Sequence, residues 1–259
     1  MTMTGPTDAR ALQVRIADDI RAKIQAEEYP PGSKLPTYDE LAEQYRCSIA
    51  ATRRAVELLR QQGLVITLHG KGSFVRERPS TRRHGTERYS RSRWLHGGQA
   101  ILIAEAADQG WTGGQKLRFL GEAPAPAEVA ERLGVEAGTP VWVRRRTTLI
   151  NGRPNQLADS YYELSVAGAT PKLKQEDTGP GGGFARLEEA GYRLDHIREE
   201  FMARMPVGPE IVALGLPEGT PVIELIRTTY DAANRPVEVM VSIIAGDMAT
   251  FCYDFPIPD

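Results

Sequence analysis

The sequence contains little cysteine, few aromatic residues and no long apolar run. Only two of its 259 residues are cysteine, and Cys47 and Cys252 are too far apart to form a metal-ligand or redox motif. We therefore expect two reduced thiols and no metal site. No stretch approaches the roughly 18–20 apolar residues that span a bilayer, and the first ten residues, MTMTGPTDAR, lack the basic and apolar regions of a signal peptide. These absences predict a cytoplasmic protein with no membrane partner.

The formal net charge is only −2, but basic residues gather in one segment. Between Arg76 and Arg93 the sequence RERPSTRRHGTERYSRSR contains seven arginines and two glutamates, interspersed with proline, serine and glycine. This composition predicts a basic linker over residues 77–93 that is mobile until it meets an anionic partner. A merely solvated connector is the alternative. Hydrophobic residues make up 41% of the chain, which is enough for a packed core on each side of such a linker.

The first 76 residues have the pattern of a helix-turn-helix. Apolar residues recur every four positions from Leu12 to Ile24 and predict an amphipathic helix. Thr37 and Glu40 have the spacing of a capping box, which predicts the start of a second helix. Ser48 can cap a third helix that runs to about Gln62, just before a glycine.

A predicted hairpin follows the third helix. Leu64–Ile66 and Ser73–Val75 have the composition of two short strands, and His69–Gly72 supplies the glycines of a tight turn. The N-terminal half of the third helix presents Ala50 and Arg53, which are small and cationic, as residues entering a major groove should be. Two helices, a tight turn and a wing in this order indicate a winged helix-turn-helix that binds DNA.

The block LPTYDELAEQYRCSIAATRRAVELLRQQGLV, followed by GKGSFV, resembles the DNA-binding domain of the GntR family of bacterial regulators. In that family an arginine of the recognition helix reads bases, and Arg53 matches it. The wing tip of the family enters the minor groove, and Gly70–Gly72 match it. Asp39 and Ile49 depart from the family, since many members have arginine at both positions. The predicted DNA contacts are Lys34, Thr37, Tyr38, Ser48, Ala50, Thr52, Arg53, Arg54, His69, Gly70, Lys71 and Gly72.

The C-terminal two-thirds contain an internal repeat. LGVEAGTPVWVRRRTT, starting at Leu133, aligns without gaps with LGLPEGTPVIELIRTT, starting at Leu214, an offset of 81 residues. Each copy predicts a short helix, a turn and a β-hairpin. The hairpins are Val141–Leu149 with Leu157–Tyr162, and Val222–Tyr230 with Val237–Ile244. Two copies suit one antiparallel sheet with a pseudo-twofold arrangement, covered by helices.

The order of motifs over residues 90–255 resembles the UTRA domain, the ligand-sensing domain of the HutC-type subgroup of GntR regulators. The resemblance rests on the GTPV strand pair, the central LEEAG helix and the terminal RPVE strand. The UTRA domain shares its fold with chorismate lyase. The resemblance implies an α+β protein with a winged helix-turn-helix over residues 1–76, the basic linker over 77–93, and an antiparallel-sheet domain over 94–259 that binds an effector and dimerises.

The predicted ligand contacts lie on the strands of the repeat. Strand alternation places Arg144, Arg146 and Thr148 on one face and Arg145 on the other. By resemblance, Arg146 holds an anionic group of the effector, because a planar guanidinium pairs with carboxylate or phosphate in a bidentate manner. A structural ion pair is the alternative for Arg146, and Arg227 is its repeat mate. The full set of predicted effector contacts is Arg144, Arg146, Thr148, Ser160, Tyr162 and Glu238.

These patterns predict a transcriptional regulator that acts as a homodimer on double-stranded DNA. We expect a repressor that places the helix Ser48–Gln62 in the major groove of an inverted-repeat operator and releases it on binding an anionic small-molecule effector. Thr148 stands where some sugar-phosphate sensors have a second arginine, so a sugar phosphate is disfavoured as effector. No cofactor and no catalytic residue are expected. Two alternatives stay open: a constitutive repressor whose second domain only dimerises, and an enzyme related to chorismate lyase.

Overall fold

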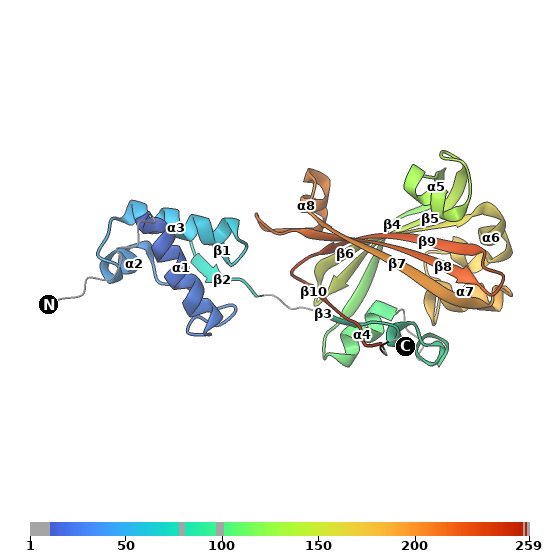
Figure 1. Cartoon of the computed structure of the whole chain (residues 1–259), viewed down its shortest axis with the longest axis horizontal. Coiled ribbons are helices and arrows are strands. Elements are labelled where there is room, and N and C mark those ends of the chain that lie inside the picture. Colours follow the sequence, from blue (N-terminus) through green and yellow to red (C-terminus); the bar gives the residue numbers. More distant parts are fainter. Residues whose placement is uncertain (1–10, 78–80, 97–100, 256, 258–259) are drawn as a thin grey trace. The chain divides into compact units, whose positions relative to one another are not determined.

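The computed structural model describes residues 11–77, 81–96, 101–255 and 257 of the chain. The chain divides near residue 78 into two compact units (Figure 1). Within the described ranges, no helix combines the length and apolar character needed to cross a membrane.

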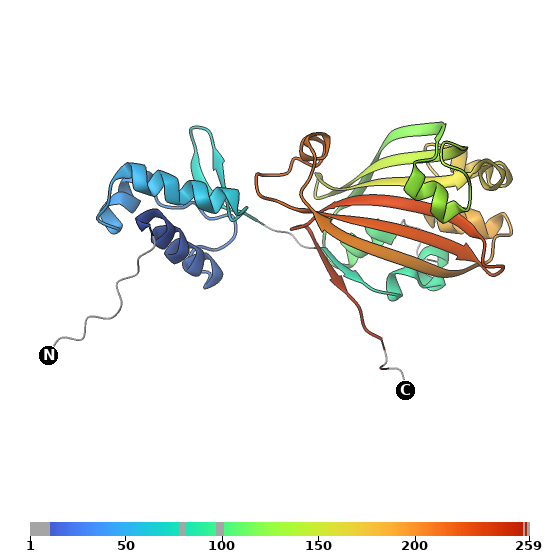
Figure 2. The same ribbon diagram turned by 45° about the horizontal axis from the view of Figure 1, so that its top comes forward.

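The first unit is a winged helix-turn-helix, as predicted. Its elements are α1 (Leu12–Gln25), α2 (Tyr38–Gln44), α3 (Ile49–Gln61), β1 (Val65–Leu68) and β2 (Gly72–Val75). The predicted capping box is present, because the Thr37 hydroxyl accepts the Glu40 amide at 3.3 Å and the Glu40 carboxylate accepts the Thr37 amide at 2.7 Å. Ser48 caps α3 by accepting the Ala51 amide. Figure 2 shows the β1–β2 hairpin projecting beyond the helices of this unit.

The buried stripe of α3 agrees only in part with the apolar pattern of the sequence. That pattern predicts that Ala51, Ala55, Leu58 and Leu59 face inward. Ala55 and Leu59 do so, but the rest of the stripe is formed by Thr52 and Val56, while Ala51 and Leu58 are only half-buried. The Thr52 hydroxyl donates to the carbonyls of Ile49 and Tyr38, so a polar side chain is satisfied inside the core. The apolar pattern therefore predicted the helix correctly but only half of the residues that it buries.

The second unit is built on a six-stranded antiparallel sheet with strand order β4-β5-β6-β9-β8-β7. The strands are β4 (Gly113–Pro124), β5 (Pro140–Ile150), β6 (Arg153–Glu163), β7 (Leu194–Arg204), β8 (Val222–Asp231) and β9 (Pro236–Ala245). Both predicted hairpins are present. The repeat is longer than predicted, since β4 and β7 also correspond: Gly113 and Leu194 begin them and are 81 residues apart. Each copy is thus a strand, a helix and a hairpin.

Helices cover both faces of this sheet (Figure 1). They are α4 (Ile101–Asp108), α5 (Ala127–Leu133), α6 (Leu164–Ala169), α7 (Gly182–Glu189) and α8 (Gly208–Leu214), with short helical turns η1 (Glu87–Tyr89), η2 (Ser92–His96) and η3 (Pro171–Lys174). The α5 helix packs on Val141, Val143 and Val239, which point to one face. The α6, α7 and η3 elements pack around Tyr162 on the opposite face.

Residues 81–93 belong to the second unit, so the prediction of a linker over residues 77–93 is wrong for most of its length. β3 (Thr81–His84) pairs in parallel with β10 (Ala249–Cys252). Arg83 is 1% exposed and Arg88 is 5% exposed. Residues 78–80 lie outside the described part of the chain. A composition rich in arginine and serine cannot distinguish arginines in solvent from arginines that face a polar cavity, which is why the prediction failed.

Candidate DNA-binding surface and ligand pocket

The exposed N-terminal half of α3 is cationic. Ser48, Ala50, Arg53 and Arg54 are all exposed there. The Arg53 guanidinium lies over the Tyr38 ring, 5.5 Å from its centroid, and such a contact holds a cation in place without neutralising it. An exposed arginine held in this way can donate to a base edge or a phosphate.

The wing tip is small and cationic. The Lys71 amide donates to the Leu68 carbonyl at 3.0 Å and closes the turn, with His69 and Lys71 exposed. Gly72 has a φ of 111°, and a Cβ there would lie 2.8 Å from Cε of Lys34. The backbone conformation at this position therefore favours glycine, whereas the flexible end of Lys34 could move aside for a Cβ.

The structure leaves eleven of the twelve predicted DNA contacts accessible. The exposed ones are Lys34, Thr37, Ser48, Ala50, Arg53, Arg54, His69, Gly70 and Lys71, and the half-buried ones are Tyr38 and Gly72. Thr52 is fully buried, so the prediction that it contacts DNA is wrong. Neighbouring residues on a helix point about 100° apart, so Thr52 faces the core while Arg53 faces solvent.

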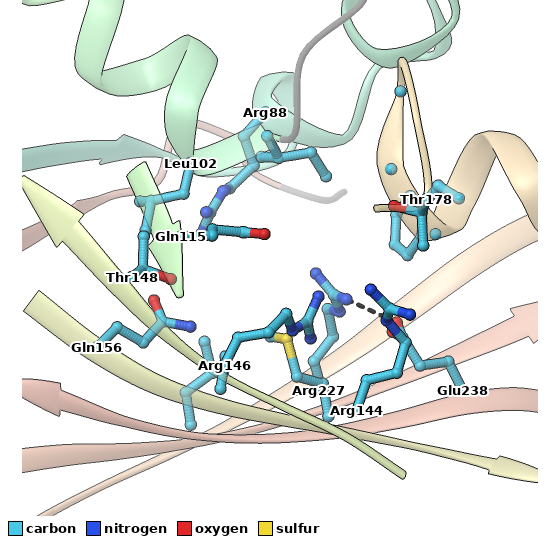
Figure 3. A pocket seen from close by; sticks show the side chains of 18 of the residues that line it. Arg88, Leu102, Gln115, Arg144, Arg146, Thr148, Gln156, Thr178, Arg227 and Glu238 are labelled. Atoms are coloured by element: carbon cyan, nitrogen blue, oxygen red, sulfur yellow. Dashed lines mark hydrogen bonds and ion pairs between the residues drawn. The ribbon is translucent and has the colours of Figure 1, made fainter. Parts of the chain in front are cut away.

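A cavity of about 130 Å³ lies on the α7 face of the sheet in the second unit (Figure 3). Five of the six predicted effector contacts line it: Arg144, Arg146, Thr148, Tyr162 and Glu238. The sixth, Ser160, is fully buried behind Arg146 and accepts a hydrogen bond of 2.5 Å from its Nη2. The fold therefore brings together residues that are up to 94 positions apart in the sequence, from Arg144 to Glu238.

Arg144 holds the loop that follows η3. Its guanidinium donates to the carbonyl oxygens of Leu173, at 2.7 Å, of Gln175 and of Glu176, at 2.9 Å. These bonds occupy its two Nη atoms, so it contributes mainly its positive charge to the cavity. Burial lowers the pKa of Arg144 below its ordinary value.

Glu238 is held by two neighbours inside the chain. Its carboxylate accepts from Arg227 at 2.6 Å and from the Tyr162 hydroxyl at 2.7 Å, and all three side chains are buried. Burial acts to raise the pKa of Glu238, but the Arg227 charge and the Tyr162 hydrogen bond outweigh it and hold that pKa below its usual value. The Glu238 carboxylate is therefore an anion already paired within the protein.

The two repeat-related arginines differ in their partners. Arg227 forms the buried ion pair with Glu238. Arg146 is half-buried, its Nη2 donates to a neutral hydroxyl, its Nε has no hydrogen-bond partner among the described residues, and no carboxylate there pairs with it. Of the two copies, Arg146 is thus the one that can bind an external anion.

Sequence reasoning missed most of the cavity lining. Arg83, Arg88 and Gln115 reach it from elements that were predicted as linker or not predicted, and Gln156 comes from β6. Ser160 and Tyr162 share one face of their strand by alternation, and the same alternation extends to residue 156, so Gln156 could have been found. In the described part of the chain, no three His, Cys, Asp or Glu residues are grouped to hold a metal ion.

Comparison with known proteins gives two family matches. Residues 12–75 match the model described as bacterial regulatory proteins, gntR family, and residues 109–250 match the UTRA domain. The chain is 32% identical to an uncharacterized HTH-type transcriptional regulator of Streptomyces coelicolor, over 94% of this chain and 92% of that protein. It is 24% identical to the HTH-type transcriptional repressor NagR of Bacillus subtilis, over 92% of each. A crystal structure of a GntR-family transcriptional regulator superposes with a TM-score of 0.66 at 28% identity, over 96% of this chain and 99% of that one.

Proposed function

Because this chain belongs to the GntR family of bacterial regulators and is a DNA-binding transcriptional regulator with a UTRA domain, we propose that a small anion bound in the arginine-lined cavity controls its binding to DNA. The observation that carries this proposal is Arg146, an arginine that faces the cavity with free donors and no carboxylate partner among the described residues. NagR, a relative over nearly the whole chain, is named a repressor. We therefore assign repression to the ligand-free protein.

The protein binds DNA as a homodimer in this proposal. Each copy places α3 in a major groove and the His69–Gly72 tip in the adjacent minor groove, so the operator is an inverted repeat. The second unit has exposed apolar side chains that suit a subunit interface: Met202 is 55% exposed, Met205 is 62% exposed and Val212 is 83% exposed.

Ligand control requires the anion to bind the DNA-free form more tightly than the DNA-bound form. The affinity for DNA then falls by the same factor by which DNA weakens the binding of the ligand. A ligand with equal affinity for both forms would bind without any regulatory effect.

Selection of genomic fragments by the purified protein at near-physiological salt tests the DNA-binding half of the proposal. We expect a few fragments that share an inverted repeat. Fluorescence anisotropy on such a fragment then tests release by anionic metabolites. Arg146→Met should keep DNA binding and lose release, whereas Arg145→Met, the neighbouring position on the opposite face, should behave like the wild type.

Two results would contradict the proposal. Retention of all fragments with a steep salt dependence would mean that the first unit binds only the DNA backbone. If Arg146→Met is released from DNA at the same ligand concentration as the wild type, the anion site lies elsewhere. Fragments that share a repeat but are released by no anion would favour the constitutive repressor.

A further inference from the structure

Buried arginines outnumber buried carboxylates around the cavity. Four arginines there are less than a tenth exposed: Arg83, Arg88, Arg144 and Arg227. Among the described residues around the cavity, only two carboxylates are comparably buried, and each belongs to an ion pair: Glu105 with Arg88 at 2.9 Å, and Glu238 with Arg227 at 2.6 Å. Glu176 and Asp177 also line the cavity, but they are exposed to water that screens their charge. Two buried positive charges are therefore left uncompensated, in addition to half-buried Arg146.

Arg83 has the most unusual surroundings of these arginines. Its guanidinium donates to the amide oxygens of Gln156 and Asn155, and it lies 5.3 Å from the centroid of the Phe251 ring, so every partner is neutral. Its Nε is buried and has no hydrogen-bond partner among the described residues. Burial lowers the pKa of Arg83 to about 10. An unpaired charge at 1% exposure is costly for the ligand-free fold, and a bound anion would offset that cost.

The uncompensated charges reach the cavity from different elements. Arg144 and Arg146 extend from β5 of the sheet, whereas Arg83 extends from β3 and its guanidinium reaches the amide oxygens on β6. Figure 3 shows Arg88, from η1, entering from the side opposite the sheet arginines. A cavity of about 130 Å³ has room for a compact anionic group beside these arginines.

We propose that the ligand presents a compact dianion, either one doubly charged phosphate or two neighbouring carboxylates, and that Arg146 of β5 and Arg83 of β3 hold it together. This inference rests on the proposed function and adds a second binding residue and a charge to it. β3 follows the first unit after residues 78–80, which lie outside the described part. Arg83 thus puts the bound ligand in contact with the segment through which the chain continues from the DNA-binding unit.

Thermal unfolding of the full-length protein tests the proposal with simple probes. Inorganic phosphate and malonate serve as dianions, and acetate and chloride serve as monoanions at matched ionic strength. We expect the dianions to raise the melting temperature of the wild type and of Arg145→Met in a concentration-dependent manner, as any ligand of the native state does. The monoanions should not. Arg83→Met and Arg146→Met should each bind the dianions at least about tenfold more weakly, since each removes a charge-assisted hydrogen bond.

The phosphate and malonate series distinguish the two dianion classes, and the variants distinguish this inference from the proposed function. Loss of binding in Arg146→Met with full binding in Arg83→Met overturns the role of Arg83 and leaves the proposed function standing. If Arg146→Met and Arg83→Met both bind the dianions as the wild type does, the role of Arg83 and the proposed function are both overturned. The proposal of a dianion is overturned if acetate and malonate stabilise the protein equally, or if none of the probes stabilises it.

The ligand-free melting temperature separates binding from structural support. Arg83→Met removes a buried charge that has no carboxylate partner, but it also leaves the amide oxygens of Gln156 and Asn155 without their donor. These two effects oppose each other, so its ligand-free melting temperature should stay close to that of the wild type. A lower value with unchanged anion affinity would make Arg83 a structural residue. Arg83→Lys keeps the charge but loses the planar fork, and it should also weaken dianion binding, so the test stands even if Arg83→Met does not fold.

Discussion

In the first unit, the DNA-binding unit, Arg53 and Arg54 are exposed on α3. In the second unit, the UTRA unit, Arg83 and Arg144 are almost fully buried. An exposed arginine stays hydrated and meets a long polyanion whose binding weakens as salt increases. A buried arginine has already lost its water when the protein folds, so it interacts strongly with any small anion that reaches it. The comparison teaches that the same side chain can serve two kinds of recognition, and that its environment decides which.

The largest expected effect comes from removing the carboxylate that balances a buried arginine. Glu238→Ala leaves Arg227 unpaired at 7% exposure, and loss of one partner of a buried pair costs about 3–5 kcal/mol of stability. All three tryptophans, Trp94, Trp111 and Trp142, lie in the UTRA unit. Their fluorescence in urea therefore measures this loss without interference from the DNA-binding unit.

The control for this prediction is Glu200→Ala. Glu200 forms an exposed pair with Arg132, which is worth less than about 1 kcal/mol. Equal losses in the two variants would show that burial does not distinguish the two arginine pairs, and the comparison would fail.

Acid should remove the stability that the same buried pair, Glu238 with Arg227, contributes. Because the folded pKa of Glu238 lies below its usual value, its contribution is complete above the unfolded pKa of about 4.3 and is lost as the pH falls from there through the folded pKa. The stability of the UTRA unit should therefore decline in that acidic range, and Glu238→Gln should decline less. Urea midpoints from tryptophan fluorescence at a series of pH values measure this, and parallel curves for the two proteins would refute it.

The exposed arginines should affect DNA binding and leave folding unchanged. Arg53→Ala should cost about 1–3 kcal/mol in operator binding and relax the preference at one base position, if this side chain reads a base edge. Arg60→Ala is the matched control, because Arg60 lies on the same helix and is bonded to Glu57. Fluorescence anisotropy on operators with single base changes gives both values. Unchanged affinity and specificity would remove Arg53 from the base-reading residues.

The smallest expected effect tests whether the two units unfold separately. Thr37→Ala removes the cap of α2, which costs about 1 kcal/mol. Circular dichroism at helix wavelengths should show an earlier transition for the DNA-binding unit, while the tryptophan transition of the UTRA unit stays in place. A shift of both transitions would mean that the units unfold together.

Local signals made much of the fold predictable. A capping box, an N-cap serine and a glycine turn each act within four residues, so the helices and wing of the first unit could be placed from the sequence. The two hairpins of the second unit were predicted because a repeat gave two independent copies of one pattern. Strand alternation placed Arg144 and Arg146 on one face of the sheet, and the resemblance to UTRA domains marked Arg146 and Tyr162 as ligand contacts.

The missed elements depend on distant contacts. β4 and β7 are the two edge strands of the sheet, and their exposed, charged residues break the apolar alternation that marks a strand. The partner of β3 is β10, which is distant in the sequence, and nothing near Arg83 indicates that pairing. The part of the cavity lined by Arg83 could therefore not be found from local patterns.

The pairing of β3 with β10 also has a consequence for the order in which the protein is made. Thr81 and Ala249 are 168 residues apart, and a ribosome adds roughly 5–20 residues each second. β3 therefore waits on the order of ten seconds for its partner, whereas the last strand of the DNA-binding unit is complete at Val75. During translation, a nascent chain therefore presents α3, the helix proposed to enter the major groove, before the arginine-lined cavity is complete.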